Sequence, residues 1–118
     1  MMDKRVRAIT VSVLPSGLCA VERTEIEDEL DVLQGIVGGN IEAVYLSRVH
    51  GDGTHMYINE EGKFIDACLP NSIATRLARE HGWIGNDIIM GDVVILGDGE
   101  DGEEGNVADW VFDAIARL

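Results

Sequence analysis

Residues 50–55 form the only short stretch in which side chains typical of metal ligands cluster in the sequence. The stretch is His50-Gly51-Asp52-Gly53-Thr54-His55. Two imidazoles and a carboxylate can hold Zn²⁺ or another divalent cation if the loop brings them to one point. His50, Asp52 and His55 would then serve a metal-dependent hydrolase. The sequence indicates no fourth ligand, so an exposed loop with incidental histidines is the competing interpretation.

A second chemical feature is the acidic stretch at residues 98–105, which reads DGEDGEEG. It lacks the 12-residue spacing of an EF-hand calcium loop. We therefore expect a solvated, flexible arm whose carboxylates speed association with a basic partner surface. Trp83, in a glycine-containing connector, is the predicted aromatic anchor beside it. The predicted partner-binding residues are Trp83, Asp98, Glu100, Asp101, Glu103 and Glu104.

The overall charge restricts the classes of partner. The chain has 22 Asp and Glu residues against 9 Lys and Arg, a formal net charge of −13. Phosphate contacts dominate nucleic-acid affinity, so direct binding to DNA or RNA is disfavoured, as is binding to an anionic membrane. Compositional bias is an alternative reason for the acidity, since acidic surfaces also aid solubility.

A small-ligand site is a further possibility. The glycine-containing loops at 51–53 and 82–85 could shape a pocket, and Arg48, Arg76 or Arg79 could meet phosphate groups. A pocket of this kind is often built between subunits, so a homo-oligomer is possible. The glycines at 35, 38 and 39 follow a predicted helix instead of preceding one, which does not fit a dinucleotide-binding loop. We expect no cofactor.

The elements that position these groups can be predicted from periodicity and turn residues. Residues 4–14 alternate as a strand, and Pro15-Ser16-Gly17 predicts a turn back into a second strand at 18–26. A helix is expected from about Asp28 to Val37, ended by Gly38-Gly39. Residues 41–46 are apolar on both faces, which predicts a central strand.

The second half of the chain repeats this mixture of strands and helices. A hairpin is expected from residues 56–58 and 63–65, followed by a helix over 72–81 and a buried strand at 93–96. Asn106 is the predicted cap of a helix over 106–118, after the acidic loop 98–105. Residues 1–118 thus predict a single α+β domain. It would have a mainly antiparallel sheet of five or six strands with about three helices packed on one face.

Compartment signals are few. Cys19 and Cys68 are far apart and form no CxxC pair, which predicts reduced thiols. No apolar run reaches the roughly 18–20 residues of a membrane span. The N-terminal residues show no signal-peptide pattern. A cytoplasmic location is expected.

Four sequence motifs occur in order along residues 33–97. They are Leu-Gln-Gly-Ile-Val-Gly-Gly-Asn-Ile-Glu at 33–42, Asn-Glu-Glu-Gly-Lys at 59–63, Leu-Pro-Asn at 69–71 and Gly-Asp-Val-Val-Ile-Leu-Gly at 91–97. Together they resemble an uncharacterised small-domain family of phages, plasmids and bacteria, notably actinobacteria. The resemblance implies a phage or mobile-element gene. It brings no activity, cofactor or catalytic residue with it.

These observations favour a binding protein over an enzyme. The leading hypothesis is a small acidic accessory protein of a phage or mobile element that binds a host macromolecule. Its acidic arm would contact a host protein with a basic surface, as a counter-defence inhibitor or a DNA mimic. The alternative is a protein that binds or sequesters a nucleotide, and the second alternative is the metal-dependent hydrolase.

Overall fold

The computed structural model describes residues 4–65 and 68–118, and it begins with a long β-hairpin. Strand β1 (Arg5–Val13) pairs antiparallel with β2 (Cys19–Glu27) along its whole length, from Arg5 opposite Glu27 to Val13 opposite Cys19. The turn between them contains Gly17 at φ +88°, a left-handed conformation that glycine adopts without steric cost. The predicted first hairpin is confirmed.

The sheet contains six strands, and its order is β2-β1-β5-β4-β3, with β6 pairing onto β5. The remaining strands are β3 (Ile41–Tyr45), β4 (His55–Asn59), β5 (Val93–Asp98) and β6 (Glu104–Gly105). All of these pairings are antiparallel. The predicted α+β class with a mainly antiparallel sheet is confirmed. β5 lies in the middle, between β1 and β4.

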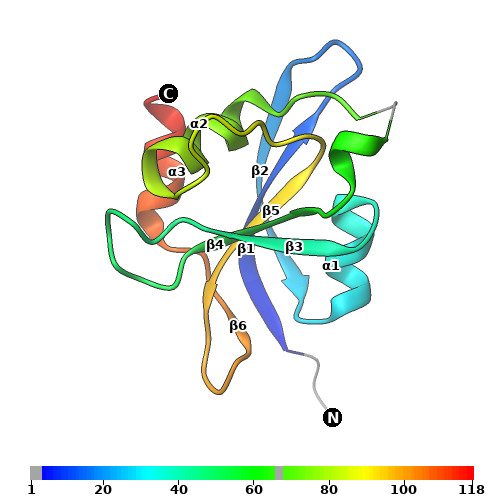
Figure 1. The fold of residues 1–118 in the computed structure, drawn as a ribbon. Coiled ribbons are helices and arrows are strands. Elements are labelled where there is room, and N and C mark those ends of the chain that lie inside the picture. Colours follow the sequence, from blue (N-terminus) through cyan, green and yellow to red (C-terminus); the bar gives the residue numbers. More distant parts are fainter. Residues whose placement is uncertain (1–3, 66–67) are drawn as a thin grey trace.

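Helices cover both faces of the sheet (Figure 1). Helix α1 (Leu30–Val37) packs on one face, while α2 (Ser72–His81) and α3 (Asp109–Ala116) pack on the other. The expectation that all helices share one face is wrong. β1 and β5 have apolar side chains on both faces, so each face requires a covering helix. In β5, Val93 and Ile95 face α2 and α3, whereas Val94 and Leu96 face α1.

Asn71 fixes α2 against the sheet. Its side chain is fully buried and accepts a hydrogen bond from the backbone N–H of Ala74, as a helix N-cap does. Its amide group also donates to the carbonyls of Val11 and Gly91, each at 2.9 Å. One side chain therefore joins α2, β1 and the segment before β5, and the predicted opening of this helix at Asn71 is confirmed.

Two strand predictions differ from the structure. β3 is an edge strand, not a central one, and Tyr45 at its end is 58% exposed. Residues Gly62–Phe64 form a short 3₁₀ helix instead of the second arm of a hairpin. The Asn59 side chain accepts from the N–H of Glu61 at 2.8 Å, which turns the chain immediately after β4.

The last helix begins later than predicted. Asn106 does not cap it, because its side-chain oxygen accepts the backbone N–H of Arg7 on β1 at 2.8 Å. The helix starts at Asp109. In the described parts of the chain, no helix combines the length and the apolar character needed to cross a membrane.

Candidate functional site

The loop between β3 and β4 separates the three predicted metal ligands. His50 stacks on the ring of Trp110 in α3 with a centroid distance of 4.2 Å, and Asp52 accepts a hydrogen bond from Trp110 Nε1 at 2.9 Å. His55, in β4, is turned toward β6 instead. Among the described residues, no three His, Cys, Asp or Glu side chains are grouped to hold a metal ion. The loop histidine and Asp52 thus clamp the loop onto α3.

His81, at the end of α2, completes this aromatic cluster. Its ring lies 4.6 Å from that of Trp110 and 5.6 Å from that of His50. Burial lowers the pKa of His81, and the neighbouring His50 lowers it further. For Asp52, partial burial acts to raise the pKa. Hydrogen bonds from Trp110 and Thr54 outweigh this effect, so the pKa is below its usual value.

The predicted acidic arm is an ordered hairpin. β5 continues to Asp98, and β6 returns beside it through a turn in which Asp101 and Gly102 have positive φ. Lys4 crosses to the hairpin and donates 2.7 Å hydrogen bonds to the Glu103 carboxylate and the Glu104 carbonyl. The glycines allow the two strands to approach closely, since a Cβ on Gly105 would lie 2.2 Å from the Asp98 carbonyl oxygen.

Glu104 points into the molecule. Its side chain is 13% exposed and accepts from Nε2 of His55 at 2.7 Å and from the Tyr57 hydroxyl at 2.6 Å. The other ring nitrogen of His55 donates to the Gly53 carbonyl at 2.7 Å. Burial raises the pKa of Tyr57, and the hydrogen bond to Glu104 adds to this effect.

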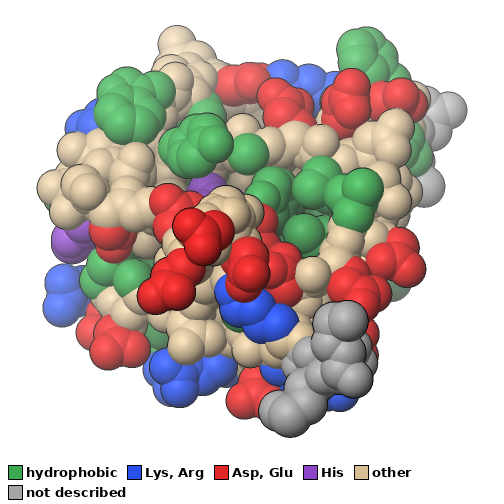
Figure 2. All heavy atoms as spheres, turned by 90° about the horizontal axis from the view of Figure 1, so that it is seen from below, with side chains coloured by type: hydrophobic (Ala, Val, Ile, Leu, Met, Phe, Trp, Pro, Cys, Tyr) green, Lys and Arg blue, Asp and Glu red, His purple; other side chains and the backbone are tan. Residues whose placement is uncertain are grey.

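The other predicted partner residues remain on the surface. Asp98, Glu100, Asp101 and Glu103 are exposed on the hairpin, and Trp83 is 67% exposed in the loop after α2. Figure 2 views the molecule from below, and Asp and Glu side chains gather in the middle of this face beside a basic group. Of the predicted contact residues, Glu104 is the one that is largely shielded from solvent, because its side chain contacts His55 and Tyr57.

Two of the three arginines suggested for phosphate contacts instead stabilise the end of α2. Arg48 donates to the carbonyls of Gly82, Arg79 and Glu80, and Arg79 donates to those of Asn86 and Asp87. The carbonyls that Arg48 contacts lie at the C-terminal end of α2, where cations are favoured, whereas those that Arg79 contacts lie in the loop after the helix. Arg76 is exposed on α2. The structure does not gather the three guanidinium groups around the loops at 51–53 and 82–85.

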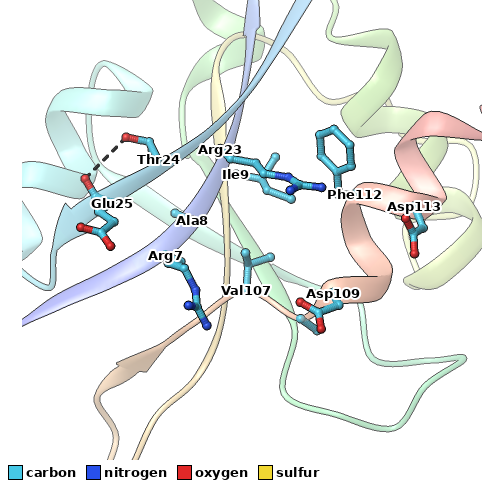
Figure 3. Close-up of a pocket in the computed structure, with 11 residues that line it drawn as sticks. Arg7, Ala8, Ile9, Arg23, Thr24, Glu25, Val107, Asp109, Phe112 and Asp113 are labelled. Atoms are coloured by element: carbon cyan, nitrogen blue, oxygen red, sulfur yellow. Dashed lines mark hydrogen bonds between the residues drawn. The ribbon is translucent and has the colours of Figure 1, made fainter.

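A groove with a volume of about 680 Å³ lies between the first hairpin and α3. This volume falls in the range of roughly 300–1,000 Å³ that is typical of ligand pockets. Figure 3 shows Arg7 and Arg23 reaching into the groove from β1 and β2, with Phe112, Asp109 and Asp113 on the α3 side. The lining residues are Arg7, Ala8, Ile9, Arg23, Thr24, Glu25, Val107, Ala108, Asp109, Phe112 and Asp113.

The two guanidinium groups of this groove make no ion pair with any described residue, although carboxylates line the same groove. Arg23 lies over the ring of Phe112, with its guanidinium carbon 3.7 Å from the ring centroid. This cation–π contact holds Arg23 in one orientation while leaving its hydrogen-bond donors available.

Sequence reasoning did not single out these groove residues. The strand register places Arg7 opposite Glu25 and Ile9 opposite Arg23, so the four side chains share one face of the hairpin. That alternation was a usable signal for the floor of the groove. The second wall is formed by α3, which lies about a hundred positions after β1 in the chain. Patterns among neighbouring residues do not predict how α3 packs against the hairpin.

Comparison with known proteins identifies the family. The family model described as "Domain of unknown function (DUF3846)" matches residues 9–117. The chain belongs to this family. The sequence-based resemblance to an uncharacterised domain family is therefore confirmed, and the match extends across both walls of the groove, apart from Arg7 and Ala8. No curated protein matches the chain in sequence.

A solved structure gives a likeness of fold. The chain is similar to part of the crystal structure of the small RNA methyltransferase HEN1, with a TM-score of 0.59 and 16% sequence identity. The match covers 98% of this DUF3846 chain but only 16% of the methyltransferase chain. At this identity the likeness concerns the fold alone.

Proposed function

We propose that this DUF3846 domain binds a small anionic ligand in the groove between the first hairpin and α3. The observation that carries this proposal is that Arg7 and Arg23 form no ion pair with any residue that the structure describes, although acids outnumber bases 22 to 9 in the chain. Guanidinium groups bind carboxylate or phosphate oxygens through paired donors. A groove that presents two such groups without a carboxylate partner among the described residues suits an anion from solution.

Local organisation supports the same proposal. Arg23 is already fixed on Phe112, so less side-chain freedom would be lost when a ligand binds. Both arginines stand on paired strands, which position them more rigidly than loops would. The proposed function is the binding of this ligand.

The test is titration of the full chain with inorganic phosphate and ribose 5-phosphate, followed by NMR at the arginine side-chain Nε–H signals. Binding should shift the Arg7 and Arg23 signals, and Arg7→Gln or Arg23→Gln should weaken it about tenfold or more. Arg76→Gln is the matched control, because Arg76 is exposed on α2 outside the groove. Equal affinity in all three variants, or no shift with either compound, would refute the proposal.

The acidic hairpin supports a second candidate function, docking on a basic surface of a host protein. The chain would then be an accessory protein or an inhibitor that a phage or mobile element encodes. Its carboxylates would occupy the positions that the phosphates of a nucleic acid take on the basic surface. The specific support is that the hairpin is held in place by Lys4 and Glu104 while Glu100 and Asp101 project from it. An ordered acidic surface loses less entropy on docking than a flexible arm.

This candidate is tested with a double variant, Glu100→Gln with Asp101→Asn, which leaves the inward contacts of the hairpin intact. Asparagine tolerates the positive φ at position 101. Capture of a host protein at low salt should decrease in this variant and decrease with added salt. Asp31→Asn with Glu42→Gln removes the same charge elsewhere and should not affect capture. Undiminished capture by the hairpin variant would reject this function.

A further inference from the structure

We infer that the ligand of the groove is a nucleoside monophosphate. This inference rests on the proposed anion-binding function and adds the chemistry of the remainder of the ligand. Three groups of side chains in the groove differ in what they can recognise, and the three parts of a nucleotide match them. They are the guanidinium of Arg7, the stacked pair Arg23 and Phe112, and the carboxylates of Asp109 and Asp113.

Arg7 provides the phosphate contact. In the register of the hairpin it lies diagonally across from Arg23, since Arg7 faces Glu25 and Arg23 faces Ile9. Diagonal neighbours on one face are separated by roughly 7–8 Å. This is a separation of strand positions, and the long arginine side chains can bring their guanidinium groups to the two ends of a ribose, where its phosphate and its base are attached. The two arginines can therefore hold opposite ends of one nucleotide.

Arg23 and Phe112 provide the surface for the base. The guanidinium plane already packs on one aromatic ring, and its other face can accept a second planar ring. Every nucleobase has a face that stacks on an aromatic or guanidinium plane. A phosphate without a base would leave this planar surface unused.

Asp109 and Asp113 provide acceptors for sugar hydroxyls. They are four positions apart, at the start of α3 and one turn later, and both line the groove. Ionised carboxylates only accept hydrogen bonds, so they suit hydroxyl donors and repel phosphate. In Figure 3 they approach from the α3 side, opposite the strands that carry the arginines.

The charge balance of the groove limits the ligand to one phosphate. Arg7 and Arg23 contribute +2, while Glu25, Asp109 and Asp113 contribute −3, so the lining carries a net charge of −1. A single phosphate can pair with Arg7, while the positive charge of Arg23 lies at the other end of the ligand. A triphosphate would add several negative charges beside three carboxylates, and like charges at close range repel. The groove is thus expected to prefer monophosphates.

The experiment is isothermal titration calorimetry of the full chain with AMP, GMP, CMP and UMP. ATP, adenosine, ribose 5-phosphate and inorganic phosphate serve as comparison ligands. At least one monophosphate should bind tenfold or more tightly than ATP, its own nucleoside, ribose 5-phosphate and inorganic phosphate. Arg7→Gln should reduce the affinity for this nucleotide to that for its nucleoside. Arg23→Lys keeps the charge but removes the planar surface, so it should bring nucleotide affinity down to that of ribose 5-phosphate, and Arg76→Gln should change nothing.

The outcomes separate this inference from the function on which it rests. If ribose 5-phosphate or inorganic phosphate binds as tightly as every nucleotide, the inference is overturned while anion binding stands. Preference for ATP over all monophosphates also overturns it. If none of these anions binds, both proposals fail. Arg23→Lys with undiminished nucleotide preference would contradict the assigned role of the stacked pair.

Discussion

Glu104 and His55 are 49 positions apart in the chain, and the His55 Nε2–H donates to Glu104 Oε1 at 2.7 Å. This contact, together with that from Tyr57, turns an apparently free acidic segment into a fixed part of the sheet. The consequence is that acids of the same hairpin have different roles. Glu104 stabilises the fold, whereas Glu100 and Asp101 are exposed and face solvent.

Glu104→Ala should therefore lower the free energy of unfolding by about 2–4 kcal/mol, because it leaves the buried His55 ring and the half-buried Tyr57 hydroxyl without their shared acceptor. Chemical denaturation of wild type and variant measures the change. Glu100→Ala, on the same hairpin, should stay within about 0.5 kcal/mol of wild type. Equal effects of the two substitutions would contradict the inward role of Glu104.

Tyr57 should resist ionisation at alkaline pH, because burial and the Glu104 carboxylate raise the pKa of its hydroxyl above its ordinary value of 10.0. In the unfolded chain the phenol ionises near pH 10, so the stability contributed by its protonated form decreases as the pH rises above that value. Ultraviolet absorbance during an alkaline titration should show a late tyrosine ionisation that Tyr57→Phe removes. A titration curve left unchanged by Tyr57→Phe would show that this hydroxyl is not perturbed.

His81 should make the protein less stable in mild acid. Burial lowers the pKa of His81 below its ordinary value of 6.5, so the unfolded chain takes up a proton first as the pH falls. The contribution is fully present above about pH 6.5 and is lost as the pH falls from there through the folded-state pKa. Chemical denaturation at pH 7.5 and at successive lower pH values measures how the free energy of unfolding changes with pH. This change should be smaller for His81→Gln than for wild type. An identical change in both proteins would refute the assignment.

Asn71→Ala should lower the free energy of unfolding by about 2–4 kcal/mol. The substitution removes a helix cap and the side-chain donor to the carbonyls of Val11 and Gly91 in the core. Thermal and urea denaturation would measure the loss. Asn86→Ala, in the exposed loop after α2, is the control and should have little effect. A loss below about 0.5 kcal/mol at Asn71 would contradict the bridging role.

Patterns confined to neighbouring residues predicted much of the fold. The alternation in β1 and β2, the Asn71 cap and the apolar run of β5 each report a local preference, and the structure contains all three elements. The predictions that were wrong depended on distant partners. Asn106 has the chemistry of a cap, but the backbone of Arg7 uses its side chain instead. Residues 41–46 are apolar on both faces, yet no strand in the described part of the chain pairs with the outer edge of β3.

The candidate site was less predictable for the same reason. Its first wall follows from hairpin register, which places Arg7 and Arg23 on one face. Its second wall comes from α3, and its position depends on contacts such as the Val107 N–H donating to the Arg7 carbonyl at 2.9 Å. The histidine and acidic clusters attracted attention because their residues are adjacent in sequence. In the folded chain, His50 and Asp52 contact Trp110, and Glu104 contacts His55.

The strand order also has a consequence for how the chain reaches its native state. β5 lies between β1 and β4, so the hairpin β1–β2 and the pair β3–β4 have no shared hydrogen bonds until residues 93–96 insert between them. Pairings such as Ile9 with Ile95 are far apart in sequence, which is typical of slow folding. On the ribosome, the sheet cannot close before β5 has been synthesised, and the groove cannot form before α3 has been synthesised. Until then, the face of the N-terminal hairpin that α2 and α3 cover in the folded protein stays uncovered, and at that stage the protein is most exposed to aggregation and to chaperones.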